Sequence, residues 1–98
     1  MLPKKARLTS AEVREILKNG RSVRFGTLSA KYVPAATAKA AVVVSTKVAK
    51  AAVERNKLRR AAYLVLRTSL PKGVCAVFFL HKPVLDPIEL ASLCLKLS

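Results

Sequence analysis

The sequence predicts an α+β protein with the element order α-β-β-β-α-β-α, in which a mixed four-stranded sheet and its helices form a two-layer sandwich. Two capping-box sequences, beginning at Thr9 and Asp86, mark the starts of two helices. Between them, an uninterrupted stretch rich in Ala, Lys, Arg and Leu predicts a third, longer helix. Short apolar runs at residues 42–44 and 74–80 indicate buried strands. The length of 98 residues predicts one domain covering residues 1–98.

The first helix is predicted from Thr9 to Asn19. The Thr9 hydroxyl can accept from the amide of Glu12, and the Glu12 carboxylate can accept from the amide of Thr9. Gly20 follows as a candidate left-handed cap. Two strand segments then fill residues 22–33, with a bend or bulge at Gly26.

The third strand is predicted at residues 39–45 and the fourth at 74–80, the latter buried on both faces. The long helix between them is predicted at residues 46–69. Its apolar stripe contains Leu58, Ala61, Ala62 and Val65, and its opposite side contains Asn56, Arg59, Arg60, Tyr63 and Arg67, with Arg55 at the edge. In the last helix Asp86 is the predicted N-cap, and Glu89 would complete the second capping box. The helices are expected to pack mainly on one face of the sheet.

The charge of the chain predicts a polyanionic partner. There are 19 Lys and Arg residues against 5 Asp and Glu residues, which gives a formal net charge of +14. Such self-repulsion is relieved when phosphates neutralise the cations, so nucleic acid is the first candidate. No apolar run is long enough to span a bilayer, and no apolar segment of a secretory signal follows the N-terminal lysines. We therefore expect a cytoplasmic protein without a membrane partner.

The sequence offers no recognisable protein-built catalytic site. Cys75 and Cys94 lie in apolar surroundings, which is typical of buried small side chains, and His81 follows a predicted strand as a loop residue. The sequence lacks a Walker loop and a dinucleotide-binding glycine motif. We predict neither catalytic residues nor metal ligands in the chain, so that any catalysis would come from a partner.

The candidate RNA-binding residues lie in and just before the long helix. Arginine can bind phosphate with two hydrogen bonds, and asparagine can bind a sugar hydroxyl or a base edge. A helix sets the spacing of these side chains in advance. The alternative is an ordinary solvated basic face. The candidates are Lys47, Lys50, Arg55, Asn56, Lys57, Arg59, Arg60 and Arg67.

This segment resembles the signature of the bacterial ribonuclease P protein family. The strand ending Val44-Ser45-Thr46-Lys47 is followed by Ala52-Val53-Glu54-Arg55-Asn56-Lys57-Leu58-Arg59-Arg60, which is similar to the family's Arg-Asn block. Family members often carry a second lysine where Thr46 stands and a phenylalanine where Val13 stands. The resemblance covers nearly the whole chain, and the central block is its diagnostic part.

The resemblance implies an accessory subunit of an endonuclease that removes the 5′ leader of precursor tRNA. It implies that the partners are the catalytic RNA of ribonuclease P and precursor tRNA, with no further protein required, and that Mg²⁺ is bound mainly by the RNA, which performs the hydrolysis. A ribosomal-protein-like fold with a left-handed β-α-β crossover is also implied. The expected leader cleft lies between the first helix and the sheet, with Val13, Leu17, Phe25 and Tyr32 as candidates, although Phe25 is better explained as core.

Two other functions fit the charge. One is a non-catalytic ribosomal or general structural RNA-binding protein, which has the same fold class but does not require the Arg-Asn block. The other is a cationic protein that binds membrane surfaces, which would need an isolated amphipathic basic helix. The Arg-Asn block favours the ribonuclease P interpretation.

Overall fold

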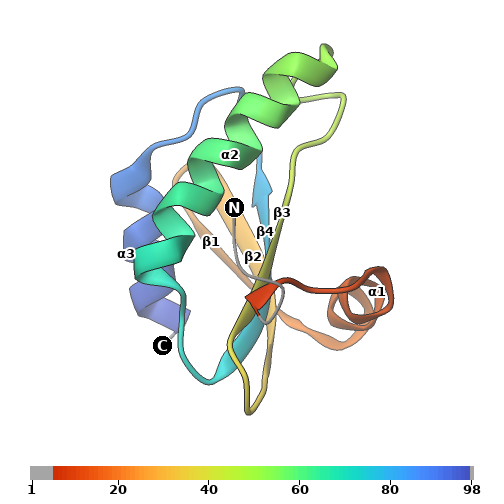
Figure 1. Ribbon diagram of the computed structural model, residues 1–98, viewed down its shortest axis with the longest axis vertical. Helices are drawn as coiled ribbons and strands as arrows, with labels where there is room; N and C mark the ends of the chain where they lie inside the picture. The colour runs from red at the N-terminus through yellow and green to blue at the C-terminus, as the bar shows by residue number, and fades with distance from the viewer. Residues whose placement is uncertain (1–5, 98) are drawn as a thin grey trace.

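The computed structural model describes residues 6–97 and contains all seven predicted elements in the predicted order (Figure 1). The helices and strands are α1 (Ser10–Asn19), β1 (Arg21–Phe25), β2 (Leu28–Pro34), β3 (Lys39–Val43), α2 (Ala52–Ser69), β4 (Val74–Leu80) and α3 (Pro87–Leu97).

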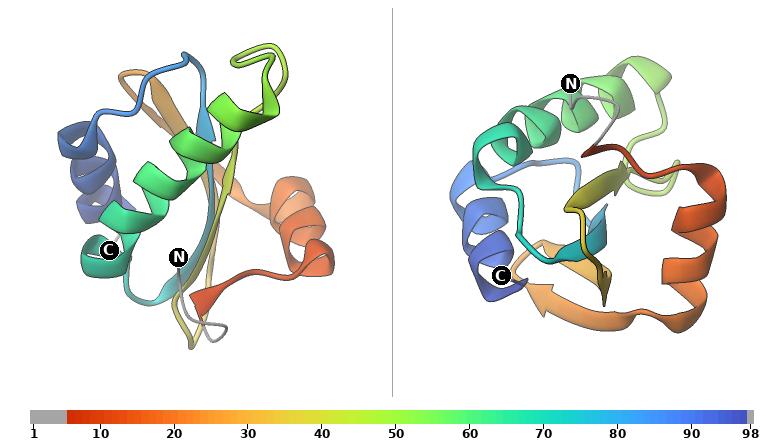
Figure 2. Two further views of the ribbon diagram at one scale, coloured as in Figure 1. Left: turned by 45° about the horizontal axis from the view of Figure 1, so that its top comes forward. Right: turned by 60° about the horizontal axis from the view of Figure 1, so that its bottom comes forward.

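The four strands form one mixed sheet in the order β1-β2-β4-β3. β1 pairs antiparallel with β2, β2 pairs antiparallel with β4, and β3 runs parallel to β4. The register places Val43 of β3 beside Phe79 of β4, so both strands end at the same edge of the sheet. The two views of Figure 2 show α2 and α3 on one face of the sheet and α1 on the other. The predicted α+β sandwich is confirmed, and α1 adds a partial third layer.

The β3-α2-β4 crossover is left-handed. From the side on which α2 lies, with both parallel strands pointing upward, β4 lies to the left of β3 (Figures 1 and 2). Crossovers between parallel strands of one sheet are almost always right-handed. The exceptional hand implied by the family resemblance is therefore present.

The main core lies between the sheet and the pair α2 and α3. Because side chains alternate along a strand, Leu28, Ala30, Ala76 and Phe78 point to this face, where Leu66 of α2 packs with them. Phe78, Leu28 and Leu66 are fully buried. Burial of each such large apolar side chain stabilises the folded state by about 1.5–3 kcal/mol.

A smaller core joins α1 to the opposite face of the sheet. Ile16 packs there against Cys75 and Val77, with Val13 and Phe79 partly buried beside them. Every residue of β4 except Phe79 is buried, which confirms the prediction that this strand is covered on both faces.

The predicted capping box of α1 is confirmed. The amide of Glu12 donates to the Thr9 hydroxyl at 3.2 Å, and the amide of Thr9 donates to the Glu12 carboxylate at 3.0 Å.

The prediction of a left-handed Gly20 is wrong, because Gly20 has an extended backbone with φ of −76°. Its amide donates to the Ile16 carbonyl oxygen at 2.7 Å, and a Cβ at this position would crowd that oxygen.

The bend predicted at Gly26 is the tight turn between β1 and β2. Gly26 has a φ of +61°, and a Cβ there would overlap the Glu89 carboxylate of α3. That carboxylate accepts from the amide and the hydroxyl of Thr27, at 3.2 and 3.1 Å.

Asp86 caps α3 as predicted, by accepting from the amides of Ile88 and Glu89. The Glu89 half of the predicted second capping box is wrong, because its carboxylate holds the hairpin turn instead.

The predicted start of the long helix at residue 46 is also wrong. Residues 46–48 form one turn, in which the amides of Val48 and Ala49 both donate to the Ser45 carbonyl at 3.1 Å. Ala49 then enters the core with 4% of its surface exposed, and α2 begins only at Ala52. Lys47 and Lys50 therefore lie on a connecting loop, residues 44–51, rather than on the helix.

The buried side of α2 is rotated slightly from the predicted stripe. Ala62 and Leu66 are buried, whereas Ala61 of the predicted stripe is exposed. Among residues 6–97, no helix is long and apolar enough to cross a membrane.

Candidate nucleic-acid interface

The loop 44–51 and α2 carry a strong excess of positive charge. Residues 44–69 contain one acidic residue, Glu54, and seven basic residues: Lys47, Lys50, Arg55, Lys57, Arg59, Arg60 and Arg67. Lys57, Arg60 and Arg67 are spaced so that they share the exposed face of α2, and each is exposed. Their side chains form no hydrogen bond or ion pair with another described residue. We call the seven basic residues together with Asn56 the α2 cationic surface.

Two arginines of the α2 cationic surface are partly buried and hydrogen-bonded. Arg55 donates through Nη1 to the carbonyl oxygens of Ala49 and Lys50, at 3.0 and 2.8 Å. Arg59 donates through Nη2 to the side-chain oxygen of Asn56. The Asn56 amide thereby limits the rotamers of Arg59 and leaves the rest of the guanidinium open to a ligand.

Apolar side chains lie on the same exposed face as the cations. Val53 is 66% exposed and Leu64 is 65% exposed, and both lie on the solvent side of α2. A face that combines cations with apolar contacts can bind phosphates and also pack against sugars or bases.

Tyr63 belongs to the fold rather than to the exposed basic side predicted for it. Its hydroxyl accepts from the amide of Val42 at 3.2 Å, and its ring packs against the main core. This hydrogen bond satisfies an outward-facing amide of β3, which is an edge strand of the sheet.

Most carboxylates are engaged away from the α2 cationic surface. Glu12 accepts from Lys39 at 3.2 Å and from the amide of Thr9, which together with Lys39 lowers its pKa. Glu89 is bound to Thr27 and Asp86 caps α3, as described above. The charge of the loop and α2 is therefore left for an external partner.

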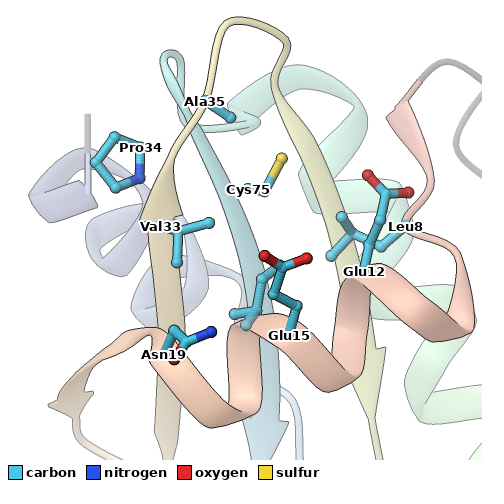
Figure 3. Close-up of a pocket in the computed structure, with 9 residues that line it drawn as sticks. Leu8, Glu12, Glu15, Asn19, Val33, Pro34, Ala35 and Cys75 are labelled. Atoms are coloured by element: carbon cyan, nitrogen blue, oxygen red, sulfur yellow. The ribbon is translucent and has the colours of Figure 1, made fainter.

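A cleft between α1 and the sheet is present, but one flank of it is unsuited to RNA. A cavity of about 360 Å³ lies between α1 and the ends of β2 and β4. Figure 3 shows Glu12 and Glu15 projecting from α1 toward this cavity, near Val33 and Cys75. Lys39 neutralises Glu12, but Glu15 has no ion pair with a described residue, so this flank keeps a negative charge and a nucleic-acid strand is not expected on it.

Val13 and Leu17, two of the predicted cleft residues, lie away from the acidic flank of α1. Val13 is half-buried against the smaller core, and Leu17 is 36% exposed. Lys31 of β2 donates to the Leu17 carbonyl oxygen at 3.0 Å and so brings a cation to this side of the sheet.

Phe25 and Tyr32 do not lie in this cleft; the preferred interpretation of Phe25 as a core residue is confirmed, and the cleft assignment of Tyr32 is wrong. Strand alternation directs both side chains to the face covered by α2 and α3, where both pack against the main core. The Phe25 ring lies under the Lys96 ammonium at 4.5 Å. The sheet separates them from α1, so they do not share a cleft with Val13 and Leu17.

The aromatic residue on the α1 face within residues 6–97 is Phe79, which was not among the predicted site residues. It lines a hollow of about 290 Å³ at the ends of β3 and β4, together with Val43, Lys47 and His81. The His81 ring shares a 2.7 Å hydrogen bond with the Ser29 hydroxyl. Alternation along β4 could have identified Phe79, since adjacent Phe78 and Phe79 must point to opposite faces.

The cysteines and carboxylates form no evident reactive centre in the part of the chain that is described. No group of three or more His, Cys, Asp and Glu side chains among residues 6–97 could hold a metal ion. Burial raises the pKa of Cys94 to about 11, and burial also raises the pKa of Cys75. Both thiols are therefore protonated near neutral pH.

Comparison with known proteins decides the family. The family model described as Ribonuclease P matches residues 2–94. The chain belongs to the ribonuclease P protein family. No curated protein was found to match the sequence.

Solved structures of ribonuclease P proteins have the same fold. The Thermotoga maritima protein is 24% identical, with a TM-score of 0.72 and 93% of each chain covered. The Staphylococcus aureus protein is 19% identical, with a TM-score of 0.71, covering 96% of this chain and 93% of that one. Family membership and fold together identify a bacterial ribonuclease P protein subunit, part of a tRNA-processing ribonuclease.

Proposed function

We propose that this subunit binds the catalytic RNA of ribonuclease P through the α2 cationic surface. The observation that carries the proposal is the set of exposed, unpaired cations on α2 and its preceding loop, against a single carboxylate in residues 44–69. Their helical spacing gives the surface a fixed geometry, and cations without protein partners gain most when they neutralise phosphates.

The 5′ leader of precursor tRNA would bind the α1 face of the sheet. The path runs from Leu17 past Phe79 to Lys47, on the side of α1 away from Glu12 and Glu15. Phe79 offers a partly exposed ring for base stacking, while Lys31 and Lys47 supply cations. The acidic flank would exclude the strand from the other side of the helix.

The hydrolysis itself would be performed by the RNA, with Mg²⁺ bound mainly by that RNA. The protein's own residues would bind and orient the two RNAs. No protein group is assigned to proton transfer in this proposal.

The test is cleavage of a precursor tRNA by bacterial ribonuclease P RNA at low Mg²⁺, with and without the protein. Correct 5′ maturation that depends on the protein is expected. Arg60→Ala should reduce the stimulation, whereas Lys72→Ala, which removes an exposed cation from the turn beyond α2, should retain it.

A folded protein that gives no stimulation with the cognate RNA would contradict the proposal. Equal affinity for ribosomal RNA would then favour a general structural RNA-binding protein. Binding to anionic vesicles with a gain of helix would instead favour a membrane-surface protein.

A further inference from the structure

The loop 44–51 presents two cations of the α2 cationic surface although it has little regular structure. Lys47 and Lys50 are exposed, while Ala49 between them is buried in the main core. Within the loop, the amides of Val48 and Ala49 both donate to Ser45. These two bonds fix the loop only as far as Ala49. The position of Lys50, and of the loop as a whole, therefore depends on what holds the carbonyl groups of Ala49 and Lys50.

The loop carbonyls are held by Arg55. Both N–H groups of its Nη1 are used, one for the Ala49 carbonyl at 3.0 Å and one for the Lys50 carbonyl at 2.8 Å. The N-cap of α2, Ala51, makes no side-chain capping bond, so the junction of loop and helix lacks the usual means of fixing a helix start. The guanidinium takes over that role from one turn inside the helix.

We propose that Arg55 is a positioning residue, which holds the loop so that Lys47 and Lys50 face the RNA. This inference rests on the proposed RNA-binding function. It adds that Arg55 does not itself contact the RNA but acts through the two loop lysines. Arg60 is the contrasting residue, because it is exposed on α2 and has no bond to the loop.

The first experiment needs no RNA. Limited trypsin digestion of the free, full-length protein is expected to cut after the exposed Lys47 and Lys50, and also after the exposed Lys72, which serves as an internal reference. In Arg55→Ala, cleavage after Lys47 and Lys50 should accelerate several-fold relative to cleavage after Lys72. Arg60→Ala should keep the wild-type ratio. An unchanged ratio in Arg55→Ala would overturn the inference. This holds whether none of the three sites is cut faster or all three are cut equally faster, since the latter would show global destabilisation.

The second experiment is a double-mutant cycle for affinity to ribonuclease P RNA. Arg55→Ala is expected to weaken binding roughly tenfold, because the released loop no longer holds Lys47 and Lys50 against the RNA. In a protein that already carries Lys47→Ala and Lys50→Ala, the same substitution should have little further effect, because its loss acts through the missing lysines.

The cycle separates the two proposals. Additive losses would mean that Arg55 contacts the RNA independently, and would overturn the positioning role while leaving the RNA-binding function in place. If the wild-type protein does not bind the RNA, the proposed function fails, and the trypsin ratio alone decides whether Arg55 holds the loop.

Discussion

Raising the salt concentration is expected to weaken binding of the protein to ribonuclease P RNA steeply. Six of the seven basic residues in the α2 cationic surface can reach phosphates, since Arg55 is bound to loop carbonyls. Each phosphate contact contributes about −0.7 to −0.9 to the slope of log K against log salt. Six contacts therefore predict a slope of roughly −4.2 to −5.4. Between about 50 and 200 mM salt, this slope corresponds to a loss of affinity of roughly 300- to 2,000-fold.

The measurement is a filter-binding or fluorescence titration at four or more salt concentrations, with Mg²⁺ held constant. Arg60→Ala should reduce the magnitude of the slope by about 0.7–0.9, because it removes one contact. Lys72→Ala removes the same charge from outside the α2 cationic surface and should leave the slope unchanged. A wild-type slope shallower than about −2 would refute the reasoning. Equal effects of the two substitutions would show that net charge, rather than this surface, drives binding.

Three further predictions concern the fold. Leu66→Ala, in a fully buried side chain of α2, should lower the free energy of unfolding by about 2–5 kcal/mol in urea titrations, and exposed Leu64→Ala should change it far less. Glu89→Ala leaves the Thr27 amide without its partner and should cost about 1–3 kcal/mol in the same titration, so an unchanged midpoint would exclude a role for this contact. Because burial raises the pKa of Cys94 to about 11 in the folded state, folding favours the neutral thiol, and this contribution to stability should be present below pH 9 and be lost as the pH rises toward 11. Unfolding titrations of wild type and Cys94→Ala at pH 8 and pH 10 would check it, and an identical loss in both proteins would contradict it.

Much of the secondary structure follows from local sequence. The capping box at Thr9 and the N-cap at Asp86 are hydrogen bonds between residues two or three positions apart, so their geometry is encoded by neighbours in the chain. The continuous apolar run of β4 likewise required burial on both faces and predicted its own bounds. The Arg-Asn block and the net charge by themselves point to an RNA-binding protein of the ribonuclease P family.

The tertiary structure alone decided which groups meet across long stretches of sequence. Glu89 could cap its own helix or bind Thr27, and it binds Thr27, 62 residues away, because α3 docks beside the hairpin turn. Neither Phe25 nor Tyr32 lies in the predicted leader cleft, because the face of the sheet that α1 covers depends on packing and not on the pattern of either strand. The start of α2 was displaced to Ala52 because burial of Ala49 and the bonds from Arg55 outweigh the helix propensity of residues 46–51. Local hydrogen bonds and apolar periodicity are properties of neighbouring residues, whereas the face, partner and position of a side chain depend on how distant elements pack.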